Sequence, residues 1–174
     1  MPQVIPGRYM AQKDGSFVVF MIGMRINKLW AVHKWLPVMQ AMPKMLKELY
    51  QNPDLGFLSA SYFISWRGIT IVQYWNSFEQ LEHYARKGAI HMKAWREFNQ
   101  KVGTSGTVGI YHETYMIDEG KYECFYNNMP VFGLAQAGRH VPVTKRAESA
   151  RERLTHSRTG SGTGSGAEAE MTSK

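Results

Sequence analysis

Residues 69–102 read ITIVQYWNSFEQLEHYARKGAIHMKAWREFNQKV, and this stretch decides the fold. Its first seven residues are rich in β-branched and aromatic side chains, which is typical of a strand. Ser77 is a favourable helix N-cap, and Gln80, three residues later, can complete a capping box. The sequence therefore predicts a strand that passes directly into a helix, and this helix runs to a stop at Gly103.

Further strands are predicted on both sides of this stretch. Segments rich in β-branched and aromatic residues cover 17–26, 56–66, 107–116 and, more briefly, 122–126. The dipeptide Arg67-Gly68 has the length of a two-residue hairpin turn, so the strands on either side of it are expected to pair. The short run 122–126 is expected to pair beside 107–116.

A first helix is predicted over residues 29–50, where apolar residues recur at spacings of three and four. Pro37 and Pro43 interrupt this segment, so we expect a kinked or two-part helix. The elements then follow the order strand, helix, strand, strand, helix, strand. This order predicts an α+β fold of the ferredoxin-like split βαβ type, with both helices on one face of an antiparallel sheet.

The other face of such a sheet would carry many large apolar side chains. Contiguous apolar patches of that size are rare on the surfaces of monomers. Two sheets packed face to face would bury them, so we expect a homodimer with a shared interior, a homodimeric α+β barrel.

The 174 residues are enough for one domain with a substantial core. We expect residues 1–150 to form the α+β-barrel domain, with a C-terminal extension over about 117–150 that wraps over the barrel or the pocket mouth. Residues 147–154 are compatible with a short helix. Residues 155–174 are rich in Gly, Ser and Thr, and are expected to form a disordered tail.

Composition argues against several partners and compartments. The net charge is +7, but the basic residues are scattered along the chain, so no nucleic-acid partner is expected. The apolar runs are shorter than the ~20 residues of a membrane-spanning helix, and no membrane partner is expected. Cys124 is the only cysteine, and no secretory leader pattern is evident, which together favour a reducing, cytoplasmic location.

The predicted second helix carries the candidate cofactor site. On a helical projection Tyr84, His91 and Trp95 fall within one apolar arc, opposite a charged arc. A neutral imidazole that projects from a helix into an apolar space can be the axial ligand of a haem iron, and the small Gly88 can let a flat macrocycle approach. The same ring can instead pack as an aromatic with its nitrogens satisfied, or serve in acid–base chemistry.

His112 lies on the last strand, on the face shared with Val108 and Ile110. If that face lines the dimer interior, His112 can be a general base or a distal hydrogen-bond donor; it can equally be a boundary residue in contact with water. Methionines at several core positions suit either an adaptable apolar pocket or an ordinary core: Met21, Met24, Met39, Met42, Met45 and Met92.

The helix sequence YWNSFEQLEHYARKGAIHMKAWREFNQ resembles the second-helix signature of the dimeric α+β-barrel superfamily, which includes antibiotic-biosynthesis monooxygenases and IsdG-like haem-degrading enzymes. FMIGMRINKLW, ISWRGITIVQYW and KYECFYNNMPVFGLAQAGRHVPV are similar to a monooxygenase-like or phenylacetaldoxime-dehydratase-like group within it. The resemblance spans about residues 5–154, and YNNMPVFGLA is its most group-specific segment.

This resemblance implies a pocket between the sheet and the helices of each subunit. It also implies that His91, which matches the proximal haem ligand of haem-binding members, would hold a haem if one is bound. Other members oxidise polycyclic aromatics without a metal or cofactor. The long first helix and the extension after Thr114 depart from the short haem-degrading enzymes.

Three functions follow as hypotheses. The first is an oxidoreductase or haem-dependent lyase that acts on a small hydrophobic or aromatic substrate, with His91 as the haem ligand and Tyr84 and Trp95 lining the pocket. The second is a cofactor-free enzyme in which His112 or His91 removes a proton from an activated aromatic substrate. The third is a dimer that binds haem or another ligand without catalysis.

Overall fold

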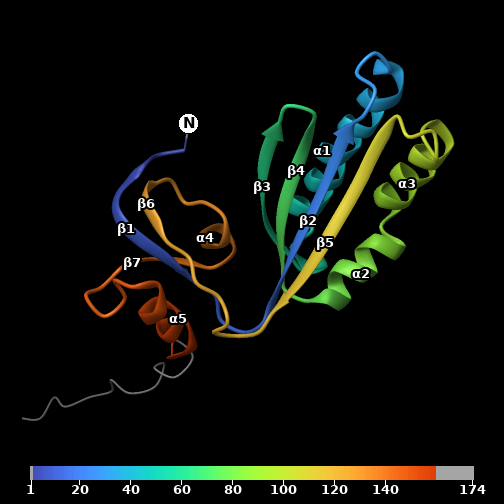
Figure 1. The fold of residues 1–174 in the computed structure, drawn as a ribbon. Coiled ribbons are helices and arrows are strands. Elements are labelled where there is room, and N and C mark those ends of the chain that lie inside the picture. Colours follow the sequence, from blue (N-terminus) through green and yellow to red (C-terminus); the bar gives the residue numbers. More distant parts are fainter. Residues whose placement is uncertain (1, 160–174) are drawn as a thin grey trace, which may run out of the picture.

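A four-stranded antiparallel sheet is the centre of the fold in the computed structural model, which describes residues 2–159 (Figure 1). Its strand order is β3-β4-β2-β5, and its members are β2 (Phe17–Ile26), β3 (Phe57–Ser65), β4 (Gly68–Trp75) and β5 (Val108–Ile117). The predicted strands agree with these bounds to within one residue at most ends. The ferredoxin-like α+β fold is thereby confirmed.

Three helices cover one face of this sheet: α1 (Val32–Gln51), α2 (Phe78–Lys87) and α3 (Ala89–Lys101). A short 3₁₀ turn, η1 (Pro53–Leu55), follows α1. Of the two forms expected for the first helix, the two-part form is wrong, because α1 is assigned without a break although Pro37 and Pro43 lie inside it. The kinked form stays a prediction. Its buried Leu46 and Leu49 pack into the main core, and this burial outweighs the loss of two backbone donors.

The second predicted helix is wrong as one continuous element, because it is interrupted at Gly88. This residue has φ −62° and ψ 116°, which is an extended conformation, and it separates α2 from α3. A Cβ atom at position 88 would lie 2.7 Å from the carbonyl oxygen of Tyr84, so the interruption also depends on the absence of a side chain. The predicted N-cap is confirmed, since the Ser77 hydroxyl accepts from the backbone N–H of Gln80 at 3.3 Å.

A smaller three-stranded sheet lies beside the first (Figure 1). It has the order β6-β1-β7, from β1 (Ile5–Gln12), β6 (Tyr126–Met129) and β7 (Arg139–Pro142), with α4 (Leu134–Ala137) between the last two. The expected pairing of 122–126 beside 107–116 is wrong, because β6 pairs with β1. The strand β1 was not predicted, because Pro6 and Gly7 are unfavourable in strands; both lie at an irregularity of the register between Ile5 and Arg8.

The smaller sheet and α4 pack against the face of the main sheet that the helices leave open. Phe17 of β2 is buried together with Ala11, Leu134 and Ala135. Phe132 meets Phe63 of β3 edge to face, with ring centroids 6.0 Å apart. The extension therefore covers part of the sheet face that was expected to be free.

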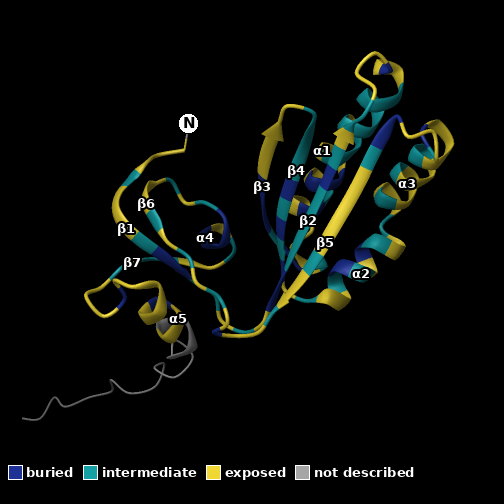
Figure 2. Cartoon of the chain, in the orientation of Figure 1, coloured by how far each residue is buried: buried dark blue, intermediate teal, exposed yellow. Residues whose placement is uncertain are grey.

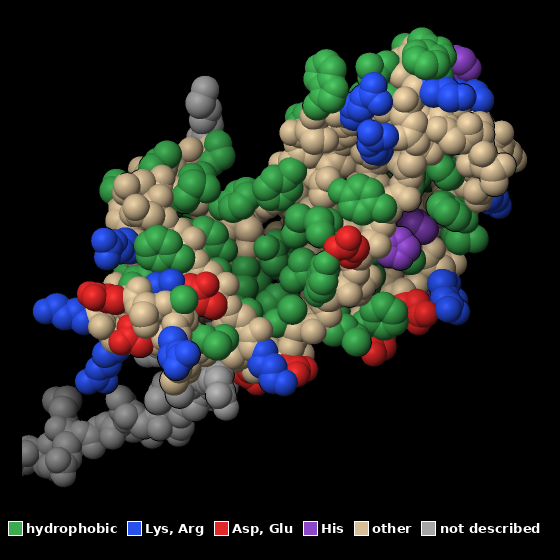
Figure 3. All heavy atoms as spheres, viewed as in Figure 1, with side chains coloured by type: hydrophobic (Ala, Val, Ile, Leu, Met, Phe, Trp, Pro, Cys, Tyr) green, Lys and Arg blue, Asp and Glu red, His purple; other side chains and the backbone are tan. Residues whose placement is uncertain are grey.

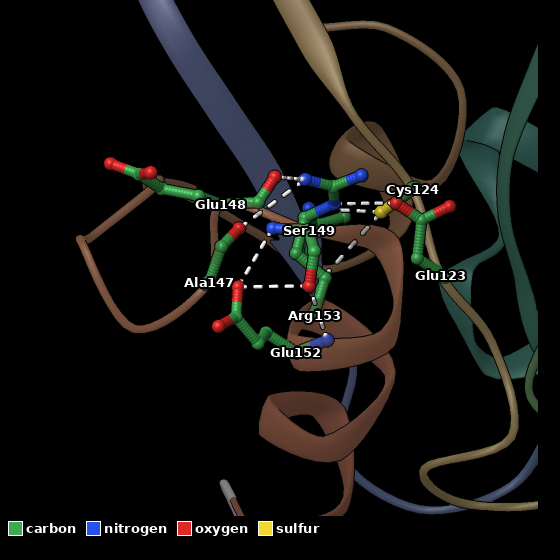
Figure 4. A network of polar contacts seen from close by, with 8 residues as sticks. Glu123, Cys124, Ala147, Glu148, Ser149, Glu152 and Arg153 are labelled. Atoms are coloured by element: carbon green, nitrogen blue, oxygen red, sulfur yellow. Dashed lines mark hydrogen bonds and ion pairs between the residues drawn. The ribbon is translucent and has the colours of Figure 1, made fainter.

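The C-terminal helix α5 (Ala150–Thr159) is held to the segment that leads into β6 by the buried side chain of Arg153 (Figure 4). The guanidinium donates to the Glu123 carboxylate at 2.5 Å and to the Glu148 carbonyl at 2.6 Å. It also lies over the Phe125 ring, 4.8 Å from the centroid. These contacts fix the first turns of α5, where Arg153 is buried between exposed neighbours.

The helix α5 includes residues 155–159, which overlap the tail expected over 155–174. Its first turn is capped by Ser149, whose backbone N–H and hydroxyl both donate to the Glu152 carboxylate. The rest of the predicted tail, 160–174, lies outside the described residues. The domain boundary near 150 stays a prediction.

Candidate functional site

A cavity of about 880 Å³ lies between the main sheet and α1, α2 and α3. This volume falls in the range of small-molecule sites, and most of the lining side chains are apolar. Five of the six methionines proposed for a pocket line it: Met24, Met39, Met42, Met45 and Met92. Met21 does not, because it lies on β2 between Phe20 and Ile22, whose side chains point to the helix side.

The sheet wall of the cavity places His112 opposite Ile22. The two residues are partners in the pairing of β5 with β2, and both line the cavity. The His112 ring lies 5.6 Å from the Phe20 ring. The condition that this face lines a dimer interior is not met, because the face of β5 that carries His112 is turned towards the helices. His112 is exposed on this edge strand, which Figure 2 shows largely in yellow.

The helix wall contributes Tyr84 from α2, and His91 and Trp95 from α3. The His91 ring lies 6.0 Å from the Tyr84 ring, and its Nδ1 atom is buried with no hydrogen-bond partner among the described residues. The His91 ring thus packs beside an aromatic residue, and no protein group among the described residues satisfies its Nδ1 atom. The choice between haem ligand, packed aromatic and acid–base residue stays a prediction. A buried imidazole nitrogen without a partner is free to bind a ligand or a proton.

Trp95 and Gly88 differ in their relation to the cavity. Trp95 is 50% exposed and stacks on Phe98, with ring centroids 5.8 Å apart, so an aromatic pair lies where this wall meets solvent. Gly88 does not line the cavity; it packs against Tyr84 at the junction of α2 and α3. Its small size therefore serves helix packing, and not the approach of a flat cofactor.

Two polar contacts lie among the apolar walls. The Tyr84 hydroxyl donates to Oε2 of Glu48 at 2.8 Å, and the indole N–H of Trp75 donates to Oε1 of buried Gln73 at 2.9 Å. Burial, followed by the hydrogen bond to Glu48, raises the pKa of Tyr84 well above its ordinary value of 10.0. Tyr84 is therefore a neutral hydrogen-bonded wall residue at physiological pH, and does not act as a phenolate.

The Tyr84 contact predicts a loss of stability in alkaline solution. A pKa that folding raises stabilises the folded state below pH 10.0, and this contribution is lost as the pH rises towards the folded value. Tyr84→Phe is expected to lower the free energy of unfolding by about 1–2 kcal/mol at pH 7 and to make its fall above pH 10 less steep. Urea denaturation at pH 7, 9 and 11 measures both effects.

Glu48→Gln is the matched variant, because it keeps an acceptor for the Tyr84 hydroxyl and removes the carboxylate charge. It is expected to be less destabilising than Tyr84→Phe at pH 7. The pKa of Tyr126 is also raised by burial, so the alkaline slope is expected to shrink without vanishing. An unchanged slope in Tyr84→Phe would contradict the assignment.

Phe20, Gln73 and Glu48 belong to the site but were not predicted from the sequence. Gln73 stands out in the sequence as a polar residue inside the apolar strand 69–75, and the alternation of that strand places it beside Ile71 and Trp75. Glu48 gave no comparable signal, because its contact with Tyr84 joins two helices that are separated by 36 positions in the chain.

Comparison with known proteins identifies relatives of this chain. The sequence pattern of the family described as monooxygenase af470-like matches residues 17–134. Monooxygenase af470 of Aspergillus fumigatus is 29% identical over 177 residues, a match that covers 87% of this chain and 61% of that protein. This chain therefore spans less than two thirds of the relative's length.

Two solved aldoxime dehydratases share the fold. The enzyme OxdRE, in complex with butyraldoxime, matches 79% of this chain and 40% of its own with a TM-score of 0.62 and 16% identity. A second aldoxime dehydratase matches 79% of this chain and 43% of its own with a TM-score of 0.60 and 17% identity. At these identities the likeness shows the fold alone.

Proposed function

Because this chain belongs to the monooxygenase af470-like family, we propose that it is an oxidoreductase that acts on a small hydrophobic or aromatic substrate in the cavity between its sheet and its helices. The resemblance to monooxygenase-like barrel proteins is confirmed at the level of the family. An apolar cavity with few polar groups is the environment that such a substrate requires. Oxidation of the substrate at one defined position then requires a reactive side chain or cofactor in the wall of the cavity.

His91 is the residue that we propose for this reactive role. The observation that supports it is the buried Nδ1 atom, which has no hydrogen-bond partner among the described residues. A buried polar atom of this kind costs free energy unless a ligand or substrate satisfies it. His112 lines the same cavity from the opposite wall, so two imidazoles flank the space in which a substrate would bind.

The residues of this wall fit a haem held by His91. The imidazole is uncommitted, and the neighbouring side chains of Tyr84, Trp95 and Met92 provide apolar surface. A bound haem would supply activation of oxygen, or a Lewis-acidic iron for the nitrogen of an aldoxime. In either case the chain would orient the substrate against its methionines and exclude water, with His112 as a hydrogen-bond donor.

A cofactor-free reaction is the second candidate, and the presence of two imidazoles in one cavity favours it. His91 or His112 would remove a proton from an activated methylene of the substrate. The methylene can supply four electrons to oxygen, so that one oxygen atom enters the substrate as a carbonyl and the other leaves as water. No external reductant is needed for that balance.

We also propose that two copies of the chain associate through the face of the main sheet that lies opposite the helices. Large side chains remain exposed on this face beyond the region that the smaller sheet covers: Tyr111 is 42% and Tyr115 46% exposed. A second copy would bury them. A homodimer would place one cavity in each subunit.

Binding of haemin tests the first candidate against the second. The purified chain is expected to develop a Soret band near ~410 nm on addition of haemin, and His91→Ala is expected to weaken or remove it. His83→Ala is the matched control, because His83 is exposed on α2 and does not line the cavity. A band that is equally strong in His91→Ala would contradict haem ligation by this residue.

A wild-type chain that shows no band would leave the cofactor-free reaction as the candidate. Oxygen uptake with a panel of aromatic substrates then tests it, in the absence of added metal and flavin. Uptake that depends on His91 or His112 would support acid–base chemistry in the cavity. Binding of such substrates without any turnover would support a ligand-binding protein instead.

A further inference from the structure

Three connections lie at one end of the four-stranded sheet (Figure 1). They are the loop from β2 to α1, the turn between β3 and β4, and the loop from α3 to β5. The backbone N–H of Ile26 donates to the Arg67 carbonyl at 2.7 Å, and that of Lys28 donates to the Thr107 carbonyl at 3.2 Å. These hydrogen bonds join segments that are far apart in the sequence. We call residues 27–34, 64–68 and 102–107 the loop end.

The loop end exposes large apolar side chains. Trp66 is 87%, Ile64 84% and Trp30 80% exposed, and Leu29 and Val32 are exposed beside them in the chain. Neither of the two indole N–H groups forms a hydrogen bond within the described residues. Single exposed apolar residues are ordinary, but a group of this size on a single end of a domain marks an interaction surface.

The charged residues of the loop end are all basic. No Asp or Glu occurs in residues 27–34, 64–68 or 102–107, which form the loop end. The same end carries Arg25, Lys28, Lys34 and Arg67. On the face shown in Figure 3, hydrophobic and basic side chains lie together at this end, and acidic side chains lie elsewhere.

The loops are fixed in place before any partner binds. The indole of Trp35 donates to the Leu29 carbonyl at 2.9 Å, and the Asn27 amide donates to the Gly106 carbonyl at 3.1 Å. The Arg25 guanidinium in turn donates to the Asn27 side chain at 2.6 Å. An ordered surface loses little conformational entropy when it binds.

We propose that the loop end binds the surface of membranes that contain anionic lipids. Tryptophan is the side chain that prefers the interface between headgroups and acyl chains, and nearby Lys and Arg are attracted to anionic headgroups. A nucleic acid would use the cations but would leave Ile64, Leu29 and Val32 without an apolar contact. The exposed hydrophobic side chains therefore favour a lipid surface.

Binding to the surface of a membrane does not require a helix that spans it. The expectation of no membrane partner rested only on the short apolar runs of the sequence. No helix among the described residues is long and apolar enough to cross a membrane. Attachment to the membrane interface requires only a cluster of exposed apolar side chains with Lys or Arg around it. The tertiary fold forms such a cluster when it brings distant loops together.

The cavity reaches towards the same end of the sheet. Met24 and Ile69 line it and are partners in the pairing of β2 with β4, one step from the pair of Arg25 and Gly68. Docking of the loop end would bring this part of the cavity close to the lipid phase, where hydrophobic molecules accumulate. This consequence rests on the proposed function, whereas the docking itself does not.

Sedimentation with lipid vesicles tests the proposal on the full chain. Binding is expected to vesicles of phosphatidylcholine with about 30% phosphatidylserine, and to be much weaker without phosphatidylserine or in about 0.5 M salt. The double variant Trp30→Ala/Trp66→Ala is expected to bind about tenfold or more weakly. Lys28→Gln/Arg67→Gln is expected to lose about tenfold, with a smaller dependence on salt.

Matched controls lie outside the loop end. Met116→Ala removes a side chain that is 74% exposed at the opposite end of β5, and Lys47→Gln removes an exposed cation from the far half of α1. Both are expected to bind vesicles as the wild type does, with unchanged thermal unfolding. Equal vesicle binding by the tryptophan variant would overturn the proposal.

The same variants distinguish two alternative binding partners of the loop end, a nucleic acid and a second copy of the chain. A wild-type chain that ignores vesicles but binds an oligonucleotide through Lys28 and Arg67 would overturn the proposal in favour of a nucleic acid. Loss of self-association in Trp30→Ala/Trp66→Ala, without vesicle binding by the wild type, would overturn it in favour of a second copy. Neither outcome bears on haemin binding or oxygen uptake, which test the proposed function separately.

Discussion

His91→Ala is expected to lower the turnover of a hydrophobic substrate by roughly 100-fold or more. The imidazole is the one group of the helix wall with a buried polar atom that lacks a partner among the described residues. Whether it holds a haem or removes a proton, its loss leaves a cavity wall without a reactive group. Steady-state turnover with the best substrate of an aromatic panel measures the effect.

The comparison with other histidines gives this prediction its specificity. His83→Ala is expected to leave turnover unchanged, because that residue is exposed and lies outside the cavity. His112→Ala is expected to reduce turnover less than His91→Ala, since its exposed side chain is already in contact with water. A larger loss in His112→Ala would transfer the reactive role to the sheet wall.

Trp75→Ala is expected to lower the free energy of unfolding by about 3–5 kcal/mol. The side chain is fully buried, and its ring lies 5.4 Å from Phe57 and 5.9 Å from Tyr84. The substitution also leaves the buried Gln73 carbonyl without the donor that it has in the native fold. Equilibrium denaturation in urea, followed by far-UV circular dichroism, measures the change.

Trp66→Ala is the matched control for this substitution. It removes the same side chain from a position that is 87% exposed, so it is expected to change stability by only about 0.5 kcal/mol. Trp75→Phe keeps an aromatic ring in the core and is expected to fall between the two. A loss below ~1 kcal/mol in Trp75→Ala would show that the core around β4 is less tightly packed than the structure indicates.

The sequence predicted the main sheet well because its strands have strong local signals. Residues 17–26 are rich in β-branched and aromatic side chains, and the strand found has the same bounds. The helix at Ser77 begins where its N-cap indicates. Helix continuity was harder to predict: Pro37 and Pro43 did not divide α1, whereas Gly88, which carries a weaker local signal, separated α2 from α3.

Part of the candidate site was also predicted from a local sequence signal, the periodicity of apolar residues on one helix. Tyr84, His91 and Trp95 share an apolar arc in the sequence, and all three line the cavity. Gly88 also lies near that arc, but its contact with Tyr84 belongs to the helix junction. Their roles in catalysis or in binding haem stay predictions, and so does the role of His112.

The sequence by itself determined the order of the strands of the main sheet and of the helices that cover it, and the sides on which their apolar residues fall, because hydrophobic periodicity acts over a few neighbouring residues. Only the tertiary structure decided which distant segments meet. The pairing of β1 with β6 joins residues such as Tyr9 and Tyr126, and the loop end brings Trp30 and Trp66 to one end of the sheet. Such contacts are selected by the burial and hydrogen bonding of the whole chain, and local patterns do not encode them.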